Sequence, residues 1–173
     1  MSLQRLITPS RELEKQIRKH VIEVRDYLVT CGYREVVIFR EARNGLVYCA
    51  AWELVDVPSD TNLAIGYGRV SQDVQSKGHS LSTQVRHELE LAAQRGHVLH
   101  YFFVDAGVSG RDDRSPAFSR MMRRAVQGDV VAVYCFDIQL FYRNLHGLTT
   151  QVAKFHVNGL ALISKADQNT DFS

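Results

Sequence analysis

Tyr67-Gly68-Arg69-Val70-Ser71 is the segment on which the predicted fold and chemistry of this chain depend. The apolar, glycine-containing run 64–70 predicts a short buried strand, and the polar stretch 72–78 predicts a loop after it. Side chains two residues apart on a strand point to the same face, so Arg69 and Ser71 are expected side by side. A guanidinium that holds phosphate oxygens beside a hydroxyl suits attack on a phosphate diester.

Two other interpretations of this segment have to be weighed. A serine at a strand end commonly hydrogen-bonds its own backbone in a turn. The spacing Gly66-x-Gly68-x-x-Ser71 also imitates a dinucleotide-binding fingerprint. That fingerprint needs a third glycine and a helix that starts at once, and here a polar loop follows instead.

Outward from this segment, strands and helices are predicted to alternate to the end of the chain. Further strands are predicted at 98–104, 130–136 and 160–163, and helices from Ser80 to Gly96, from Ser115-Pro116 to Gly128, and over 144–157. This order predicts an α/β fold with a mostly parallel central sheet flanked by helices. Such sheets carry their chemistry at the carboxyl ends of the strands, where Ser71, Asp105 and Asp137 are expected.

Residues 1–60 predict a small α+β module in front of a main domain at 61–173. A helix begins at Thr8-Pro9-Ser10, and its apolar stripe runs through Leu13, Ile17, Val21, Val24 and Leu28. Strands at 35–40 and 46–54 are joined through Asn44-Gly45, a strong hairpin signal. The module is expected to pack on the sheet, with self-association and DNA contact as the alternatives.

Composition bounds the class of protein. The 173 residues are 45% hydrophobic, which is enough for a core, and the formal net charge is only +2, so any affinity for DNA must come from local clusters of arginine. Cys31, Cys49 and Cys135 show no disulfide or metal-ligand pattern, and no apolar run is long enough to span a membrane. These features predict a cytoplasmic protein with reduced cysteines.

The ordered motifs resemble the serine recombinases, which comprise resolvases, invertases and large serine integrases. The resemblance covers about residues 63–173. It is carried by Tyr67-Gly68-Arg69-Val70-Ser71, Ser80-Leu81-Ser82-Thr83-Gln84, Asp105-Ala106-Gly107-Val108-Ser109-Gly110, Asp113-Arg114-Ser115-Pro116-Ala117-Phe118, and Asp137 with Leu140 and Arg143-Asn144.

This resemblance implies a DNA recombinase that needs neither a metal nor another cofactor. Ser71 is the implied nucleophile, and it displaces the DNA 3′ oxygen to form a 5′-phosphoserine bond that the reverse attack resolves. The implied phosphate clamp consists of Arg69, Arg114 and Arg143. Supporting positions are Gln84, Ser109 and Asp105, with Ala106 as the alternative match for the family carboxylate. DNA is the implied partner, and a homodimer that assembles into a tetramer on DNA is the implied oligomer.

Further candidate DNA contacts are Tyr67, Arg111 and Arg124. Tyr67 has a position in the core as its alternative, and Arg124 has a solvated helix face, since Arg120, Arg123 and Arg124 recur at helical spacing. His79 in the nucleophile loop is interpreted as solvated, with proton transfer as the alternative.

One departure from the family pattern concerns the run Asp137-Ile138-Gln139-Leu140-Phe141-Tyr142-Arg143. Leu140 occupies an arginine position in one alignment, and Ile138 does in the other. Loss of one such preorganised charge typically lowers a rate ~10²- to 10³-fold. The alternative function is therefore a catalytically impaired regulator that binds DNA or another partner, and a nucleotide-binding α/β domain is a third interpretation.

Overall fold

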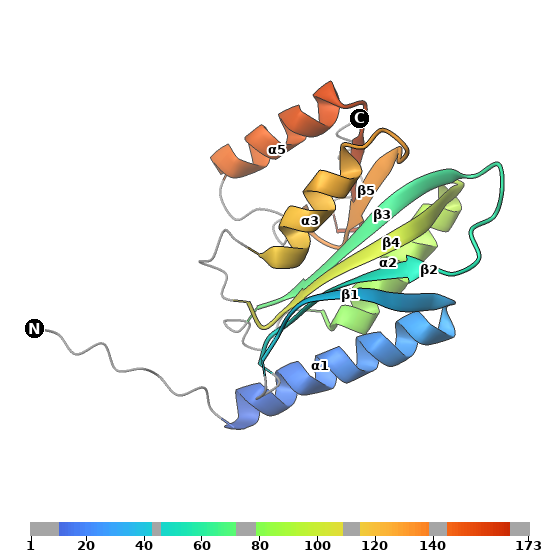
Figure 1. The fold of residues 1–173 in the computed structure, drawn as a ribbon. Coiled ribbons are helices and arrows are strands. Elements are labelled where there is room, and N and C mark those ends of the chain that lie inside the picture. Colours follow the sequence, from blue (N-terminus) through green and yellow to red (C-terminus); the bar gives the residue numbers. More distant parts are fainter. Residues whose placement is uncertain (1–10, 43–45, 72–78, 109–114, 139–144, 167–173) are drawn as a thin grey trace, which may run out of the picture.

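One six-stranded sheet organises the described part of the chain (Figure 1). The computed structural model describes residues 11–42, 46–71, 79–108, 115–138 and 145–166. The strand order is β1-β2-β4-β3-β5-β6. Its strands are β1 (Tyr33–Glu41), β2 (Tyr48–Leu54), β3 (Asn62–Val70), β4 (His97–Ala106), β5 (Ala132–Cys135) and β6 (Ala161–Ser164), and its helices are α1 (Arg11–Thr30), α2 (Leu81–Gln94), α3 (Pro116–Ala125) and α5 (Leu145–Val157).

The strands β4, β3, β5 and β6 are parallel to one another, and β2 and β1 extend the sheet beyond β4 in antiparallel pairing. Each step between parallel strands passes through a helix: α2 after β3, α3 after β4 and α5 after β5. This is the predicted α/β class with a mostly parallel sheet, and it is confirmed. The carboxyl ends of β3 and β4 meet, because Val70 is paired with Ala106.

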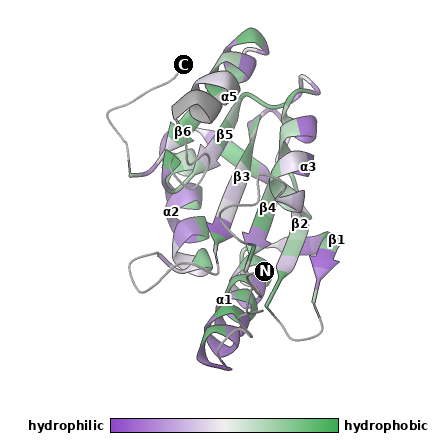
Figure 2. Cartoon of the chain, turned by 90° about the vertical axis from the view of Figure 1, so that its left-hand side faces the viewer, coloured by the Kyte–Doolittle hydropathy of each residue, from purple (hydrophilic) through white to green (hydrophobic). Residues whose placement is uncertain are grey.

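Helices cover both faces of the sheet and separate the core into two layers. One layer packs α1 and α2 against the sheet, and the other packs α3 and α5 against the opposite face. The turned view of Figure 2 shows the strands between α2 and α3. The stripe predicted on α1 is confirmed by four buried residues, which are Ile17, Val21, Val24 and Leu28, whereas Leu13 is partly buried at the margin of the core.

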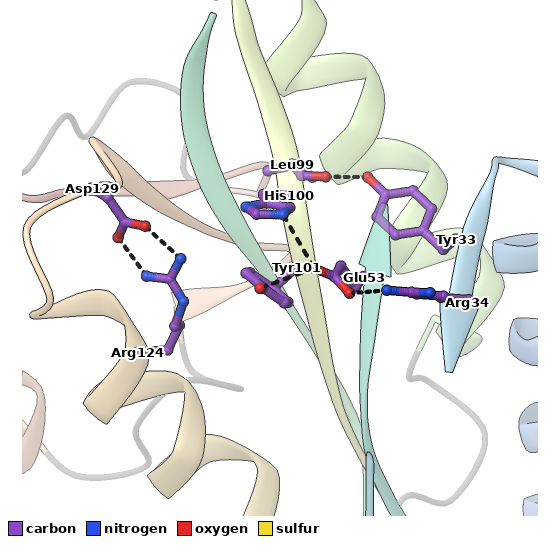
Figure 3. A network of polar contacts seen from close by, with 8 residues as sticks. All are labelled: Tyr33, Arg34, Glu53, Leu99, His100, Tyr101, Arg124 and Asp129. Carbon is purple, nitrogen blue, oxygen red and sulfur yellow. Dashed lines mark hydrogen bonds and ion pairs between the residues drawn. The ribbon is translucent and has the colours of Figure 1, made fainter. Parts of the chain in front are cut away.

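The predicted N-terminal helix and hairpin form, and the hairpin is part of the same sheet. β2 pairs with β4 from Tyr48 opposite Ala106 to Glu53 opposite Tyr101. The Glu53 carboxylate accepts a hydrogen bond from Tyr101 at 3.2 Å and pairs with Arg34 of β1 at 3.1 Å (Figure 3). The predicted turn at Asn44-Gly45 lies outside the described residues. A domain boundary at residue 60 stays a prediction, and hydrogen bonds of the sheet cross it.

Gly66 lets the ring of Phe102 lie directly against β3. A Cβ atom at residue 66 would stand 2.3 Å from Phe102 Cε1, and Phe102 is fully buried. The neighbouring strand therefore packs across the bare backbone of β3, and the core at this point has no room for one more methyl group.

We expect Gly66→Ala to lower the free energy of unfolding by about 1–3 kcal/mol, because a buried ring has to move. Gly68→Ala is the matched control, since its Cβ would meet Leu81 Cδ2 at an ordinary 3.4 Å. We expect the control to cost less than about 1 kcal/mol. Urea unfolding of both variants measures the difference, and equal losses would contradict this account of the packing.

Candidate active site

Ser71 lies immediately after β3, at the edge where the parallel strands end. Its side chain is buried, with 4% of the residue exposed. Its Oγ makes no hydrogen bond to any of the residues that the structure describes. Buried hydroxyls normally have a partner, so this arrangement does not match a serine that satisfies its own turn.

Gln84 of α2 fixes the backbone just before Ser71. Its Oε1 accepts a hydrogen bond from the Arg69 amide at 3.1 Å, and its Nε2 donates to the Arg69 carbonyl at 2.9 Å. The same Nε2 donates to the His79 carbonyl at 3.0 Å. Gln84 is almost completely buried, at 1% exposed. One carboxamide therefore connects the backbone of Arg69 with that of His79, on the two sides of the segment 72–78. The supporting role of Gln84 in a reaction stays a prediction.

Gly107, the residue after β4, contacts the peptide group between Val70 and Ser71. Its amide donates to the Val70 carbonyl at 2.7 Å. Its φ of 76° lies in the left-handed region, and a Cβ atom there would stand 1.5 Å from the Leu46 carbonyl oxygen. Only glycine fits at this position. The backbone on the N-terminal side of Ser71 is therefore fixed by α2 and by the end of β4.

Asp105 of β4 connects three elements through one buried carboxylate. The Tyr67 hydroxyl of β3 donates to Asp105 Oδ2 at 2.8 Å. The amides of Ala117 and Phe118, in the first turn of α3, donate to Oδ1 at 3.0 Å and to Oδ2 at 2.9 Å. A carboxylate at a helix N-terminus satisfies amides that have no intrahelical partner and interacts favourably with the helix dipole.

Asp105 thereby takes over the function that the sequence suggests for Ser115. Ser115 occupies the N-cap position, with Pro116 in the first turn as predicted. The Ser115 side chain makes no capping hydrogen bond, and its buried Oγ has no partner within the described ranges. The start of α3, which follows the segment 109–114 directly, is therefore placed by β4.

Burial and negative charge keep the neighbours of Asp105 neutral. Burial, together with the nearby Asp105 carboxylate, raises the pKa of Tyr67 well above its usual value. The pKa of the Cys49 thiol, opposite Asp105 in the sheet, is raised for the same two reasons. Neither group is set up to ionise and act as a nucleophile. Ser71 carries the candidate nucleophilic oxygen of this edge.

The structure brings together Tyr67, Arg69, Ser71, Gln84 and Asp105. Tyr67 and Arg69 lie on the same strand two residues apart, and the positive charge of Arg69 acts on the Tyr67 phenol. The contact of Tyr67 with Asp105 and Phe118 favours the core position over a DNA contact. The other predicted residues of the clamp and its loop, Ser109, Arg111, Arg114 and Arg143, lie outside the described residues.

Arg124 of α3 faces Asp129 (Figure 3). Its guanidinium makes two hydrogen bonds to the carboxylate of Asp129, one of them 2.6 Å long, and stacks 5.0 Å above the Tyr101 ring. Tyr101 precedes the end of β4 at Ala106 by about 16 Å of strand. A DNA contact by Arg124 stays a prediction, and its charge already has an intramolecular partner.

Comparison with known proteins assigns most of the chain to one family. A model of the family described as Resolvase, N terminal domain matches residues 64–173. The chain belongs to the resolvase family. No curated protein matches it significantly.

Solved structures of resolvase-like domains show the same fold. The N-terminal catalytic domain of TP901-1 integrase is 22% identical, with a TM-score of 0.55, over 62% of this chain and 79% of that one. A resolvase family site-specific recombinase from Streptococcus pneumoniae is 28% identical, with a TM-score of 0.54, over 64% of this chain and 75% of that one.

The described residues contain neither a metal-binding group of side chains nor a membrane-spanning helix. Within residues 11–42, 46–71, 79–108, 115–138 and 145–166, no three His, Cys, Asp or Glu side chains are grouped so that they could hold a metal ion. In the same ranges, no helix is long and apolar enough to cross a membrane.

Glu88 was missed by the sequence analysis. It lies one helical turn after Gln84 on α2, and its Oε1 accepts a hydrogen bond from the Tyr67 amide at 3.1 Å. It is completely buried. The signal in the sequence is a polar pair at i and i+4, Gln84 and Glu88, in a helix that follows a strand with alternate glycines.

The capping arrangement at α3 predicts opposite outcomes for two alanine variants. Asp105→Ala leaves three buried donors without their acceptor, and we expect it to lower the free energy of unfolding by about 3 kcal/mol or more. Ser115→Ala should change it by less than about 0.5 kcal/mol, although an ordinary N-cap serine contributes about 1 kcal/mol. Chemical denaturation of both variants decides the matter, and a larger loss in Ser115→Ala would assign the cap to Ser115.

Proposed function

We propose that this chain is the catalytic domain of a site-specific DNA recombinase in which Ser71 is the nucleophile. Membership of the resolvase family supports the reaction class. The single observation that supports Ser71 is its place in the structure: a buried hydroxyl without a partner among the described residues, at the end of a strand whose last peptide groups are held from two sides.

The proposed reaction exchanges one phosphodiester for another. Ser71 Oγ forms a bond to phosphorus and loses its proton, while the bond from phosphorus to the DNA 3′ oxygen breaks and that oxygen gains a proton. The product is a 5′-phosphoserine link and a free 3′ hydroxyl. A 3′ hydroxyl from the exchanged strand then attacks the same phosphorus and releases Ser71. No net bond energy is lost, so the reaction needs no external energy source.

Arginine side chains are proposed to stabilise the negative charge that grows on the phosphate oxygens during the reaction. Arg69, two residues before Ser71, is the described member of the proposed clamp, and Arg114 and Arg143 are its further members. A planar guanidinium contacts two phosphate oxygens at once and keeps its charge at all relevant pH values. Preorganised donors of this kind lower the barrier for phosphoryl transfer.

DNA is the proposed partner, and a homodimer that pairs into a tetramer is the proposed assembly. Strand exchange between two DNA sites requires four cut strands, and one serine per subunit therefore requires four subunits. The acidic and basic residues of the chain nearly balance, at 19 and 21. Contacts to the DNA backbone must then come from local arginines, and binding is expected to weaken with rising salt.

The test compares variants of the full chain on a plasmid with its recombination site. Parent protein should give a covalent protein–DNA adduct that survives denaturation, and Ser71→Ala should give none. Ser115→Ala is the matched control, because Ser115 is another buried serine without a described partner and lies outside the proposed chemistry. Adduct yields as high in Ser71→Ala as in the parent would remove Ser71 from the reaction.

A second candidate function, a catalytically impaired regulator, is favoured by the apolar residues at the family's arginine positions. Ile138 is 9% exposed and packs in the core layer of α3 and α5, so it contributes no charge. Leu140, the other position, lies outside the described residues. If this function holds, the parent forms no adduct.

Leu140→Arg separates the two functions in the same adduct assay. An impaired regulator should gain cleavage when the arginine is restored, from a silent parent to a visible adduct. An active recombinase already forms adduct as the parent, and restoring the charge should raise its rate by at most ~10²- to 10³-fold. A silent parent and a silent Leu140→Arg variant would count against both predictions for this position.

A further inference from the structure

Two polar side chains of α2 lie against the backbone of β3 in matching register. Gln84 contacts the amide of Arg69, and Glu88 contacts the amide of Tyr67. Four residues of a helix rise by about 6.0 Å, and two residues of a strand span about 6.6 Å. The helix and the strand run along one another closely enough for both side chains to reach alternate amides of β3, those of Tyr67 and Arg69.

Glycine makes this contact sterically feasible. A Cβ atom at Gly68 would meet Gln84 Oε1 at 3.7 Å and Leu81 Cδ2 at 3.4 Å. Gly68 and Gly66 therefore present bare backbone toward α2 and toward the Phe102 ring. An alanine Cβ at position 68 would still fit at ordinary contact distance, whereas a side chain larger than alanine would push the helix away from the strand and move Gln84 and Glu88 away from its amides.

Glu88 is an unusual residue for a helix core. It is 0% exposed, and within the described ranges its Oε2 has no hydrogen-bond partner. Burial raises its pKa well above the usual value, against the opposing effect of the Tyr67 amide. A neutral carboxylic acid still offers a carbonyl-type acceptor to that amide. A leucine of similar size would fill the space and leave the amide unpaired, so packing alone does not account for a carboxyl group here.

We infer that Glu88 is a positioning residue of β3, the strand that leads to the proposed nucleophile. Together with Gln84, it fixes the position of β3 along α2 and thereby the positions of Arg69 and Ser71. Glu88 acts on the backbone and does not touch the reacting atoms. The claim that this placement serves the chemistry of Ser71 rests on the proposed recombinase function. The claim that Glu88 fixes the strand does not.

The first arm of the test is independent of DNA. Amide hydrogen exchange is measured residue by residue by NMR in the parent, Glu88→Gln, Glu88→Leu and the control Glu90→Gln, an acid on the same helix with an exposed side chain. In Glu88→Leu the Tyr67 amide should exchange at least ~10-fold faster relative to the Val104 amide of β4. Glu88→Gln keeps the acceptor and should stay within about threefold of the parent, as should Glu90→Gln. Equal changes of the Tyr67 and Val104 amides in Glu88→Leu would overturn the inference.

The second arm measures the rate of adduct formation at saturating DNA. Glu88→Leu should form adduct about 10-fold more slowly than the parent with unchanged DNA affinity, and Glu88→Gln should restore the rate. If the leucine variant reacts as fast as the parent, the placement has no catalytic role and that part of the inference is wrong. If the parent itself forms no adduct, the proposed function fails, and the exchange data still decide whether Glu88 fixes β3.

Discussion

The buried carboxylate of Asp105 is the constraint on which the site depends. It belongs to β4, receives the Tyr67 hydroxyl of β3 and caps the first turn of α3. These elements are far apart in the sequence, and their relative placement is set where the strands end. Because three donors share one charged acceptor, a shift of any element breaks a hydrogen bond in a buried setting, which is costly.

Around this carboxylate, β3, which leads to the proposed nucleophile, is fixed through its backbone. Gln84 and Glu88 contact amides of β3 from α2, and Gly107, the residue after β4, contacts the Val70 carbonyl. Backbone contacts of this type do not use the Ser71 hydroxyl. The proposed phosphoryl transfer depends on accurate placement of charge and nucleophile, since positioning is much of what a protein contributes to such a reaction. The N-terminal hairpin adds to this rigidity, because β2 pairs with the C-terminal part of β4, from Tyr101 to Ala106, which contains Asp105.

The sequence predicted what is local in this structure. Strand and helix order follow from apolar periodicity, and the position of Ser71 and Asp105 at strand ends follows from that order. Partners that are distant in the sequence could not be predicted from it. Local rules assign the N-cap of α3 to Ser115, whereas in the structure the acceptor is the carboxylate of Asp105. Likewise a glutamate in an amphipathic helix predicts a solvated position, and only the glycines of β3 make room for a buried Glu88. The sequence also contains no local signal that the N-terminal hairpin pairs with β4, since every edge strand offers the same unpaired backbone groups.

The most direct test of the central claim is to map the covalent link itself. The full chain is trapped on its recombination site, the DNA and the protein are digested, and the peptide that carries a nucleotide is sequenced by mass spectrometry. The account predicts a phosphodiester on the Ser71 oxygen and on no other residue. A link at a different side chain, such as Ser109 or Ser115, would contradict it.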